Sequence, residues 1–323
     1  MVKNINEPIN QHTVPRCYLK NFNTNRINKK KKTKYIVDVF DKLNESKECY
    51  STNVEKICKI NEFYTFSILP EEDKRYLEKL FSETIETDYG IIYPLLINES
   101  EIKLSNTQRV TLINFVISLF FRTSKSTNQF MSISEDLFKL GLNLIQPEKG
   151  ITKINTITGN VYDLSTQNIK DVMNQEKNIA KESSNIIKFE LALNLSRKRS
   201  NDIISITKVH PTHFLITSDN PVYFVGDFKD PNTIIKMPLN HQYILTILPK
   251  SVYPEFNHKE IFFASLDEEF SFRETSNNNL KQVKNAERFV IGKRDNIMQS
   301  LNLHLDPEVK LLIKKSKEFT NLF

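Results

Sequence analysis

Tryptophan is absent from this chain of 323 residues, and glycine occurs only six times. The glycines lie too far apart for the G-x-G-x-x-G pattern or for a P-loop, whose backbones must approach a phosphate group closely. The zinc-protease pattern H-E-x-x-H and the serine-hydrolase pattern G-x-S-x-G are also missing. The sequence therefore argues against Walker-type ATPases, protein kinases and Rossmann dehydrogenases, and we expect no nucleotide cofactor.

Cysteine is scarce as well, and its three occurrences are Cys17, Cys49 and Cys58. An odd number without a close pair argues against the disulfide framework of a small secreted protein. There is no C-x-x-C pair, and the spacing of His12 to these cysteines matches no common zinc module. Cofactors are therefore unknown at this stage, and a divalent metal ion stays open.

Long apolar runs are also missing. The most apolar segment, residues 110–121, is far shorter than the roughly 20 residues that a membrane-spanning helix needs. Residues 1–16 lack the apolar stretch of a signal peptide. We therefore expect a cytoplasmic protein without a membrane partner.

The charged residues leave a formal net charge of +6. This mild excess permits a partner that carries phosphate, such as nucleic acid, but does not require one. Its clearest block is the run Lys29, Lys30, Lys31 and Lys32. A solvated loop that contributes little to folding is the simpler interpretation. The functional one is a loop that contacts phosphate, with an affinity that falls as salt rises.

Apolar residues that recur with the helical period dominate the first part of the chain. Thr13 as N-cap and Pro15 in the first turn predict a helix that ends near Asn21. Residues 110–121 are apolar nearly all round, so a fully buried helix is expected there. Further helices are predicted over residues 70–97, 105–122, 132–144 and 166–198, a strand over 35–40 paired with 63–66, and a loop or hairpin over 150–163.

The character of the sequence changes after Ser200, where short β-like runs begin. We therefore predict an α+β fold in which a mostly helical N-terminal two-thirds packs on a β-rich C-terminal third. Residues 1–199 form the mainly helical part, with a small N-terminal hairpin, and residues 200–323 form the β-rich part. Strands are expected over 203–209, 214–217, 222–225, 233–237 and 243–248, a late helix over 279–289 and a terminal helix over 307–319.

The first candidate for chemistry begins at Gln11. His12 lies just before the predicted helix start, where backbone N–H groups and the helix dipole favour an anion. A neutral imidazole could act there as a general base, and Arg16, one turn later, could bind phosphate. The simpler interpretation is that His12 caps the helix and Arg16 forms an ordinary ion pair. Glu86 and Arg122 are expected on two neighbouring helices, where a buried ion pair explains them as well as a catalytic role does.

The second candidate is the turn Ser218, Asp219 and Asn220, which follows one predicted strand and precedes another. Such residues before a proline are ordinary turn formers, so a structural turn is the simpler interpretation. The same cluster could hold a metal-bound water or orient a histidine. His210 and His213 lie close in the sequence, but Pro211 between them argues against a helical face that presents both to a metal.

These stretches resemble the bacterial and phage family called domain of unknown function 4238. The similarity extends over about residues 10 to 292. Its specific parts are the histidine–x–Val–Pro helix that ends Tyr-Leu-x-x-Phe, at His12 to Phe22, and the run from Phe214 to Val222. It also includes the segment from Phe115 to Thr123 and the segment from Asn285 to Arg288. The family has no established activity to transfer. The resemblance implies that polar residues from the two ends of the chain converge.

Two hypotheses follow. In the first, the chain is a phosphodiester-cleaving, nuclease-like enzyme, and a role in phage defence or as a toxin is expected by association with such families. His12 would be the acid or base, Arg16 and Arg122 anion clamps, and Asp219 an orienting group or metal ligand. The remaining cleft residues would be Glu86, Ser218 and Asn220. In the second hypothesis, the chain is a non-catalytic module that binds nucleic acid or protein. Its oligomeric state is unknown at this stage.

A test of convergence follows from the two motifs. We expect His12 and the turn at Ser218–Asn220 to line one pocket. Asp219 should hydrogen-bond to backbone amides, to His12 or to Arg16, rather than point into solvent. The structural alternative is a polar clasp that ties the N-terminal helix to the sheet.

Overall fold

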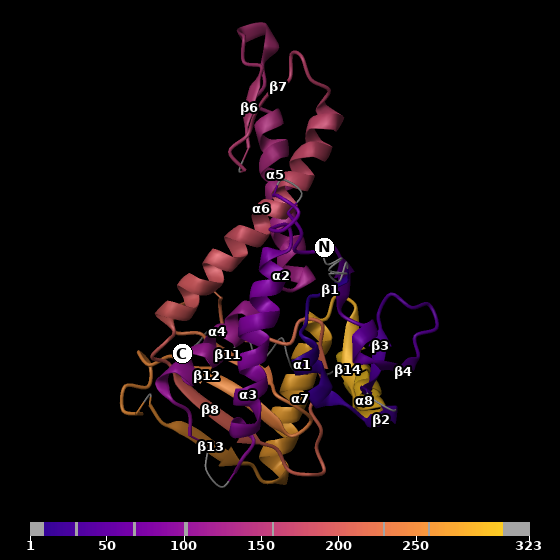
Figure 1. Ribbon diagram of the computed structural model, residues 1–323, viewed down its shortest axis with the longest axis vertical. Helices are drawn as coiled ribbons and strands as arrows, with labels where there is room; N and C mark the ends of the chain where they lie inside the picture. The colour runs from indigo at the N-terminus through magenta and orange to yellow at the C-terminus, as the bar shows by residue number, and fades with distance from the viewer. Residues whose placement is uncertain are drawn as a thin grey trace, which may run out of the picture.

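The computed structural model describes residues 10–29, 32–66, 69–99, 103–156, 158–228, 230–257 and 259–305. Figure 1 shows a body of sheets and helices from which an arm projects. The arm contains α5 (Ser124–Leu142), η4 (Pro147–Lys149), a hairpin of β6 (Lys153–Asn155) and β7 (Val161–Asp163), and the first part of α6 (Ile169–Lys198). Over the described part of the chain, no helix is long and apolar enough to cross a membrane.

A five-stranded sheet of the body has the order β10-β11-β12-β8-β13. Neighbouring strands are antiparallel, except that β13 runs parallel to β8. Alternate residues such as Ile204 and Ile206 enter the main core, as the two-residue period of a strand requires. The strands are β8 (Ile203–Lys208), β10 (Tyr223–Val225), β11 (Ile234–Pro238), β12 (Tyr243–Leu248) and β13 (Ile261–Ser265). The predictions for β8, β10, β11 and β12 are confirmed, and β13 was missed.

A second sheet combines strands from both ends of the chain. β3 (Lys32–Asp41) pairs with β2 (Asn25–Lys29), β4 (Cys49–Asn53) and β14 (Phe289–Gly292), and β14 also pairs with β9 (Thr217–Ser218). The predicted layout of a helical two-thirds followed by a β-rich third is therefore wrong, although the α+β character holds. Strands are spread over the whole chain, and β3 finds its partner β14 from far away in the sequence. The strand predicted over 35–40 is confirmed, but its predicted pairing with 63–66 is wrong.

The second sheet is buried on both faces where β3 pairs with β14. Val37 and Val39 of β3 and Ile291 of β14 belong to the main core, which also contains α3 and α4. Phe40 and Val290, one position along, belong to a separate cluster with side chains of α7 (Glu268–Asn285) and α8 (Arg294–Leu305). The alternation explains why these strands lack the polar face that would mark them as amphipathic.

The helical layer is built around α4 (Asn106–Phe121). Its start is fixed by a capping box between Ser105 and Gln108, so the predicted helix over 105–122 is confirmed. Phe115 and its neighbours Val116 and Leu119 are buried, whereas Val110 is 47% exposed, so the prediction of full burial fails at the first turn. The preceding helix is continuous but irregular, with α2 (Tyr76–Leu80), a π-helical η3 (Phe81–Glu86) and α3 (Thr87–Leu96).

The N-terminal helix is shorter than predicted. It consists of α1 (Arg16–Leu19) and η1 (Lys20–Phe22), and Thr13 does not cap it, because the Thr13 hydroxyl donates to the carbonyl of Cys58 over 3.1 Å. The late helix α7 begins earlier than predicted and ends at Asn285, so the end of the predicted helix, over 286–289, is wrong, and Phe289 instead begins β14. The remaining short elements are β1 (Asn10–His12), η2 (Val54–Lys56) and β5 (Lys59–Asn61), of which β1 and β5 pair with each other.

Two predicted features fall largely on undescribed positions. Lys29 and Lys32 pair at the end of the β2–β3 hairpin, but Lys30 and Lys31 lie outside the described residues. The terminal helix predicted over 307–319 also lies outside them.

A lysine is buried where α6 passes α5. Lys188 is 4% exposed, donates to the hydroxyl of Thr127, and lies over the ring of Phe63 at 5.5 Å from its centroid. Burial lowers the pKa of Lys188 from 10.5 to about 7. Between these two values the unfolded chain binds more protons than the folded one, so Lys188 makes stability rise with pH from about 7 upward.

We therefore expect Lys188→Met to weaken the pH dependence of stability. Across this window each pH unit changes the contribution of one such group by at most about 1.4 kcal/mol. Denaturant unfolding at pH 7, 8 and 9 measures the difference between wild type and variant. Parallel pH profiles for the two proteins would show that Lys188 is not buried as a neutral amine.

Candidate functional site

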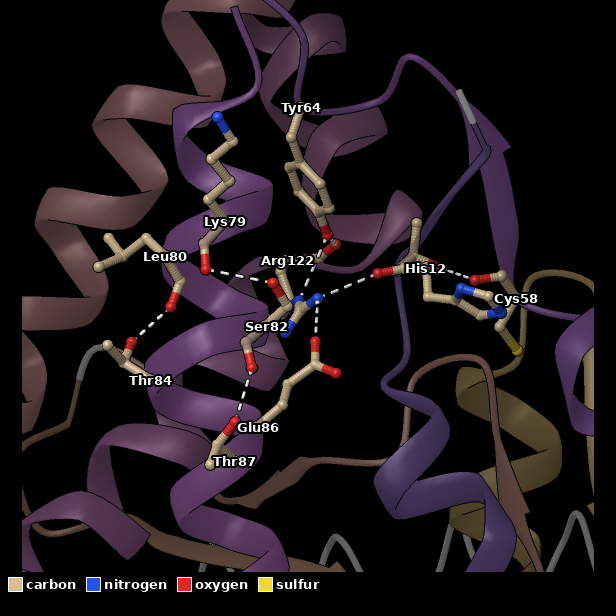
Figure 2. Close-up of polar contacts among 11 residues, drawn as sticks. His12, Cys58, Tyr64, Lys79, Leu80, Ser82, Thr84, Glu86, Thr87 and Arg122 are labelled. Carbon is tan, nitrogen blue, oxygen red and sulfur yellow. Dashed lines mark hydrogen bonds and ion pairs between the residues drawn. The ribbon is translucent and has the colours of Figure 1, made fainter. Parts of the chain in front are cut away.

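Arg122 is the centre of a buried polar cluster at the end of α4. Its Nη2 atom donates to Glu86 Oε1 over 3.0 Å and to the carbonyl of His12 over 3.1 Å. Its Nε atom lies 3.4 Å from the hydroxyl of Tyr64, and this hydroxyl donates to the carbonyl of Arg122 over 2.7 Å. The guanidinium lies over the ring of Phe81, 4.2 Å from its centroid. Figure 2 shows Arg122 between Tyr64, Glu86 and the backbone of His12.

The π-helical segment η3 positions the acidic side of this cluster. Phe81 is its first residue and Glu86 its last. Single turns of π-helix are rare and are often found at functional sites, because the wider turn changes which side chains share a face. Glu78 of α2 and Glu86 both act electrostatically on Arg122. The predicted ion pair between Glu86 and Arg122 is thus present. Glu78 was not predicted as a member of the site, since a regular helical period does not reveal a π segment.

Glu78 and His12 have opposite pKa shifts in this cluster. Burial raises the pKa of Glu78 to about 7, with Arg122 opposing the rise and Glu86 adding to it. Burial, and then the positive charges of Arg16, Lys59 and Arg122, lower the pKa of His12 to about 4. The buried atoms Glu78 Oε2 and His12 Nε2 have no hydrogen-bond partner among the described residues. Near neutral pH the cluster therefore holds an unprotonated imidazole and a carboxyl group that retains much of its proton.

Arg16 and Cys17 lie at the edge of the same cluster. Arg16 pairs with Glu55 over 3.3 Å, and its side chain is 56% exposed, so the predicted ordinary ion pair is present. Burial, and then the carboxylate of Glu86, raise the pKa of the Cys17 thiol to about 12. At neutral pH Cys17 is a thiol and a poor nucleophile.

The turn predicted as the second site is a buried hydrogen-bonded junction. The carboxylate of Asp219 accepts hydrogen bonds from the backbone amides of Glu287, Arg288 and Phe289 over 3.1, 2.8 and 3.1 Å. The prediction that Asp219 binds backbone amides is confirmed. These bonds hold the chain between α7 and β14 in place. They also give both carboxylate oxygens of Asp219 hydrogen-bond donors from the protein itself, without any ligand.

Ser218 and Asn220 join the same network. Ser218 donates to Gln282 Oε1 over 2.7 Å and accepts from the amide of Asn220 over 3.2 Å. The Nδ2 atom of Asn220 donates to Asp219 Oδ1 over 3.1 Å and to the carbonyl of Asn285 over 3.2 Å. The turn is thus tied to α7, a partner that no local pattern in the sequence indicates.

The two motifs meet through Tyr18. Its hydroxyl lies 2.7 Å from the hydroxyl of Thr217 and donates to the carbonyl of Pro238 over 2.8 Å. These bonds tie the N-terminal helix to the sheet, although through Tyr18 and Thr217 and not through His12 and the Ser218–Asn220 turn. The structure brings His12, Glu86 and Arg122 together with Arg16 nearby, and Ser218, Asp219 and Asn220 form a second group with different partners.

The histidines and acidic groups form no metal site in the described part of the chain, where three or more His, Cys, Asp or Glu side chains do not gather as ligands. His210 bonds to the hydroxyl of Thr212 over 2.8 Å, and the ring of His213 packs against Phe272.

Comparison with known proteins leads to one family. The family described as "Protein of unknown function (DUF4238)" matches residues 10–296, which is most of the chain. No curated protein and no solved structure matches it. The match includes both motif segments, the π-helical segment and the strands that close the second sheet. The chain therefore belongs to the DUF4238 family.

Proposed function

We propose that the chain is a hydrolase that cleaves a phosphodiester, with His12 as general base and Glu78 as general acid. The observation that carries this proposal is the pair of opposite pKa shifts in one cluster. Titratable groups whose environments move their pKa values apart are the usual way in which proteins assign acid and base roles. The buried, unpartnered atoms of the two side chains are the ones that would exchange protons with a substrate.

The surroundings of His12 favour an anionic substrate. Arg16 and Lys59 are exposed, and both contribute positive potential at His12. The chain as a whole has an excess of six positive charges, which favours association with polyanions. A phosphodiester is the anionic ester that fits this charge and the absence of a nucleotide-binding loop.

The proposed reaction is an ordinary hydrolysis. His12 Nε2 takes a proton from water as its oxygen attacks phosphorus, and the bond from phosphorus to the leaving oxygen breaks. Glu78 gives its proton to that leaving oxygen. Arg122 is fully engaged with Glu86, Tyr64 and the carbonyl of His12, so we assign it a positioning role in place of the anion clamp expected from the sequence.

The direct test is cleavage of labelled single- and double-stranded DNA and RNA, with and without added divalent metal. We expect His12→Gln and Glu78→Gln each to lose at least about a hundredfold in rate, which is the lower range for general acid–base groups. Matched controls are Glu83→Gln, an exposed glutamate of the adjoining π segment, and His210→Gln. Cleavage that survives both site variants would refute the assignment. Binding of nucleic acid without cleavage would favour the non-catalytic binding module.

The pH dependence of the rate follows from the two shifts. The reactive form needs His12 unprotonated, above pH 4, and Glu78 protonated, below pH 7. We expect a rate that is level between these values and falls by about tenfold per pH unit above pH 7. Measurement of the cleavage rate of wild type from pH 5 to 9 checks this. A rate that rises from pH 7 to 9 would contradict the role of Glu78.

A further inference from the structure

Three segments that are far apart in the sequence line a pocket of about 190 Å³ beside the end of α4. The pocket is separate from the cluster around Arg122, whose side chain points to Glu86 and Tyr64. Three segments that carry the resemblance to the family contribute to its lining. The first ends at Thr123, the second includes Asn220, and the third begins at Asn285. The lining of the pocket includes Phe120, Lys125, Asn220, Phe224, Lys281 and Asn285.

One residue of the pocket lining has an unsatisfied hydrogen-bond acceptor. Asn220 is 5% exposed, and its Oδ1 atom is buried without a partner among the described residues. Its Nδ2 atom donates to Asp219 and Asn285, which fixes the orientation of the amide. A buried acceptor without a donor is destabilising, so a ligand N–H that reaches Oδ1 would bind favourably there.

Aromatic rings form another part of the lining. Phe120 and Phe224 both line the pocket, and their ring centroids are 4.8 Å apart in an edge-to-face arrangement. Phe228 packs on both of them, at 5.5 and 5.0 Å, and is 43% exposed. Partly exposed phenylalanine rings of this kind are stacking surfaces for planar rings such as nucleobases.

Lysines supply positive charge at the same place. Lys125 of α5 and Lys281 of α7 both line the pocket. The Nζ atom of Lys125 lies 3.4 and 3.5 Å from the carbonyl and side-chain oxygens of Asn285, and the carboxylates of Glu287 and Asp219 act on it electrostatically. An anionic group beside Lys125 would gain a charge-assisted hydrogen bond.

We propose that this pocket binds a nucleotide, with the base against the phenylalanine rings and the acceptor of Asn220, and the phosphate beside Lys125 and Lys281. The volume of about 190 Å³ is below the roughly 300 Å³ at which sites for drug-sized ligands begin, so it suits a single base. The nucleotide is either free or part of a single strand, because both present the same base and phosphate. The proposal does not depend on hydrolysis at His12.

Calorimetric titration of the full chain distinguishes the two sources. The probes are 5′-AMP and a phosphorothioate oligodeoxyadenylate, which resists cleavage. Adenosine and ribose 5-phosphate, which lack the phosphate or the base, should each bind at least about tenfold more weakly than AMP. Lys125→Gln and Phe224→Leu should weaken binding by a similar factor, while Lys139→Gln, an exposed lysine of the same helix, should not. His12→Gln should bind as wild type does, which separates this proposal from the proposed function.

Saturable binding of AMP that both variants weaken supports a site for free nucleotides. The same pattern with the oligonucleotide alone supports a site for one nucleotide of a strand. Absence of binding to both probes, or binding that both variants leave unchanged, overturns the proposal. If a variant does not fold, hydrogen exchange on the wild-type chain gives the answer, because a bound nucleotide should slow exchange at β10 and at the start of α5. No change in exchange at either element with saturating AMP or oligonucleotide would equally overturn it.

Discussion

Replacement of Arg122 by methionine is expected to lower the free energy of unfolding by about 3–5 kcal/mol, as loss of one partner of a buried ion pair usually does. The Arg122 side chain is 3% exposed and that of Glu86 is 20% exposed, so the variant leaves a poorly solvated carboxylate without its partner. It also removes the donor to the carbonyl of His12. Denaturant unfolding, with the slope unchanged between proteins, measures the loss.

The matched control for this variant is Arg16→Met. Arg16 also pairs with a glutamate, Glu55, but its side chain is 56% exposed, and exposed pairs contribute less than about 1 kcal/mol. The double variant Arg122→Met with Glu86→Gln should recover part of the stability, because it removes the unpaired charge. A loss at Arg122 no larger than that at Arg16 would contradict the buried cluster.

A second large effect is expected from Asp219→Asn. The carboxylate accepts three backbone N–H groups and is 4% exposed. Asparagine offers one acceptor oxygen in place of two and brings an amide N–H₂ toward donors. Since a hydrogen bond to a buried charged group contributes about 1.5–3 kcal/mol, we expect a loss of roughly 3 kcal/mol or more. Thermal and denaturant unfolding measure it.

Asp267→Asn is the matched control for Asp219. Asp267 caps α7 and accepts from the single amide of Phe270 over 2.9 Å. Asparagine caps helices nearly as well as aspartate, so the control should lose less than about 1 kcal/mol. Equal losses at the two positions would show that the junction between Asp219 and residues 287–289 does not hold β14 in place.

The helices were largely predictable, because their signals are local. The capping box at Ser105 and the apolar run that follows identify α4 without knowledge of the rest of the chain. Strand pairing is different, since β3 joins β14 across nearly the whole chain and no local pattern indicates that partner. β14 itself is only four residues long and lies shortly after a helix, so no strand was predicted there and its first residue, Phe289, was assigned to the end of that helix.

The candidate site was predictable in part. Glu86 and Arg122 stood out as charged residues among apolar neighbours, and their ion pair is present. His12 was identified from its place before a proline-initiated helix, but its environment is set by burial and then by the cations around it, which a linear sequence does not show. Glu78 was missed because its position relative to Arg122 depends on the π-helical turn at η3. The Ser218–Asn220 turn was predicted to take part in chemistry because its partner, helix α7, could not be foreseen. Ser218 and Asn220 use their side chains in hydrogen bonds to that helix.

The pKa of Glu78 tests the acid–base account most directly. Carboxyl carbon resonances of ¹³C-labelled protein can be followed from pH 3 to 9, and Glu78→Gln identifies the resonance of Glu78 by its loss, with Glu83→Gln as control. The account predicts that this resonance titrates near pH 7. Titration near the ordinary value of 4.5 would contradict it, because Glu78 would then have no proton to donate at neutral pH.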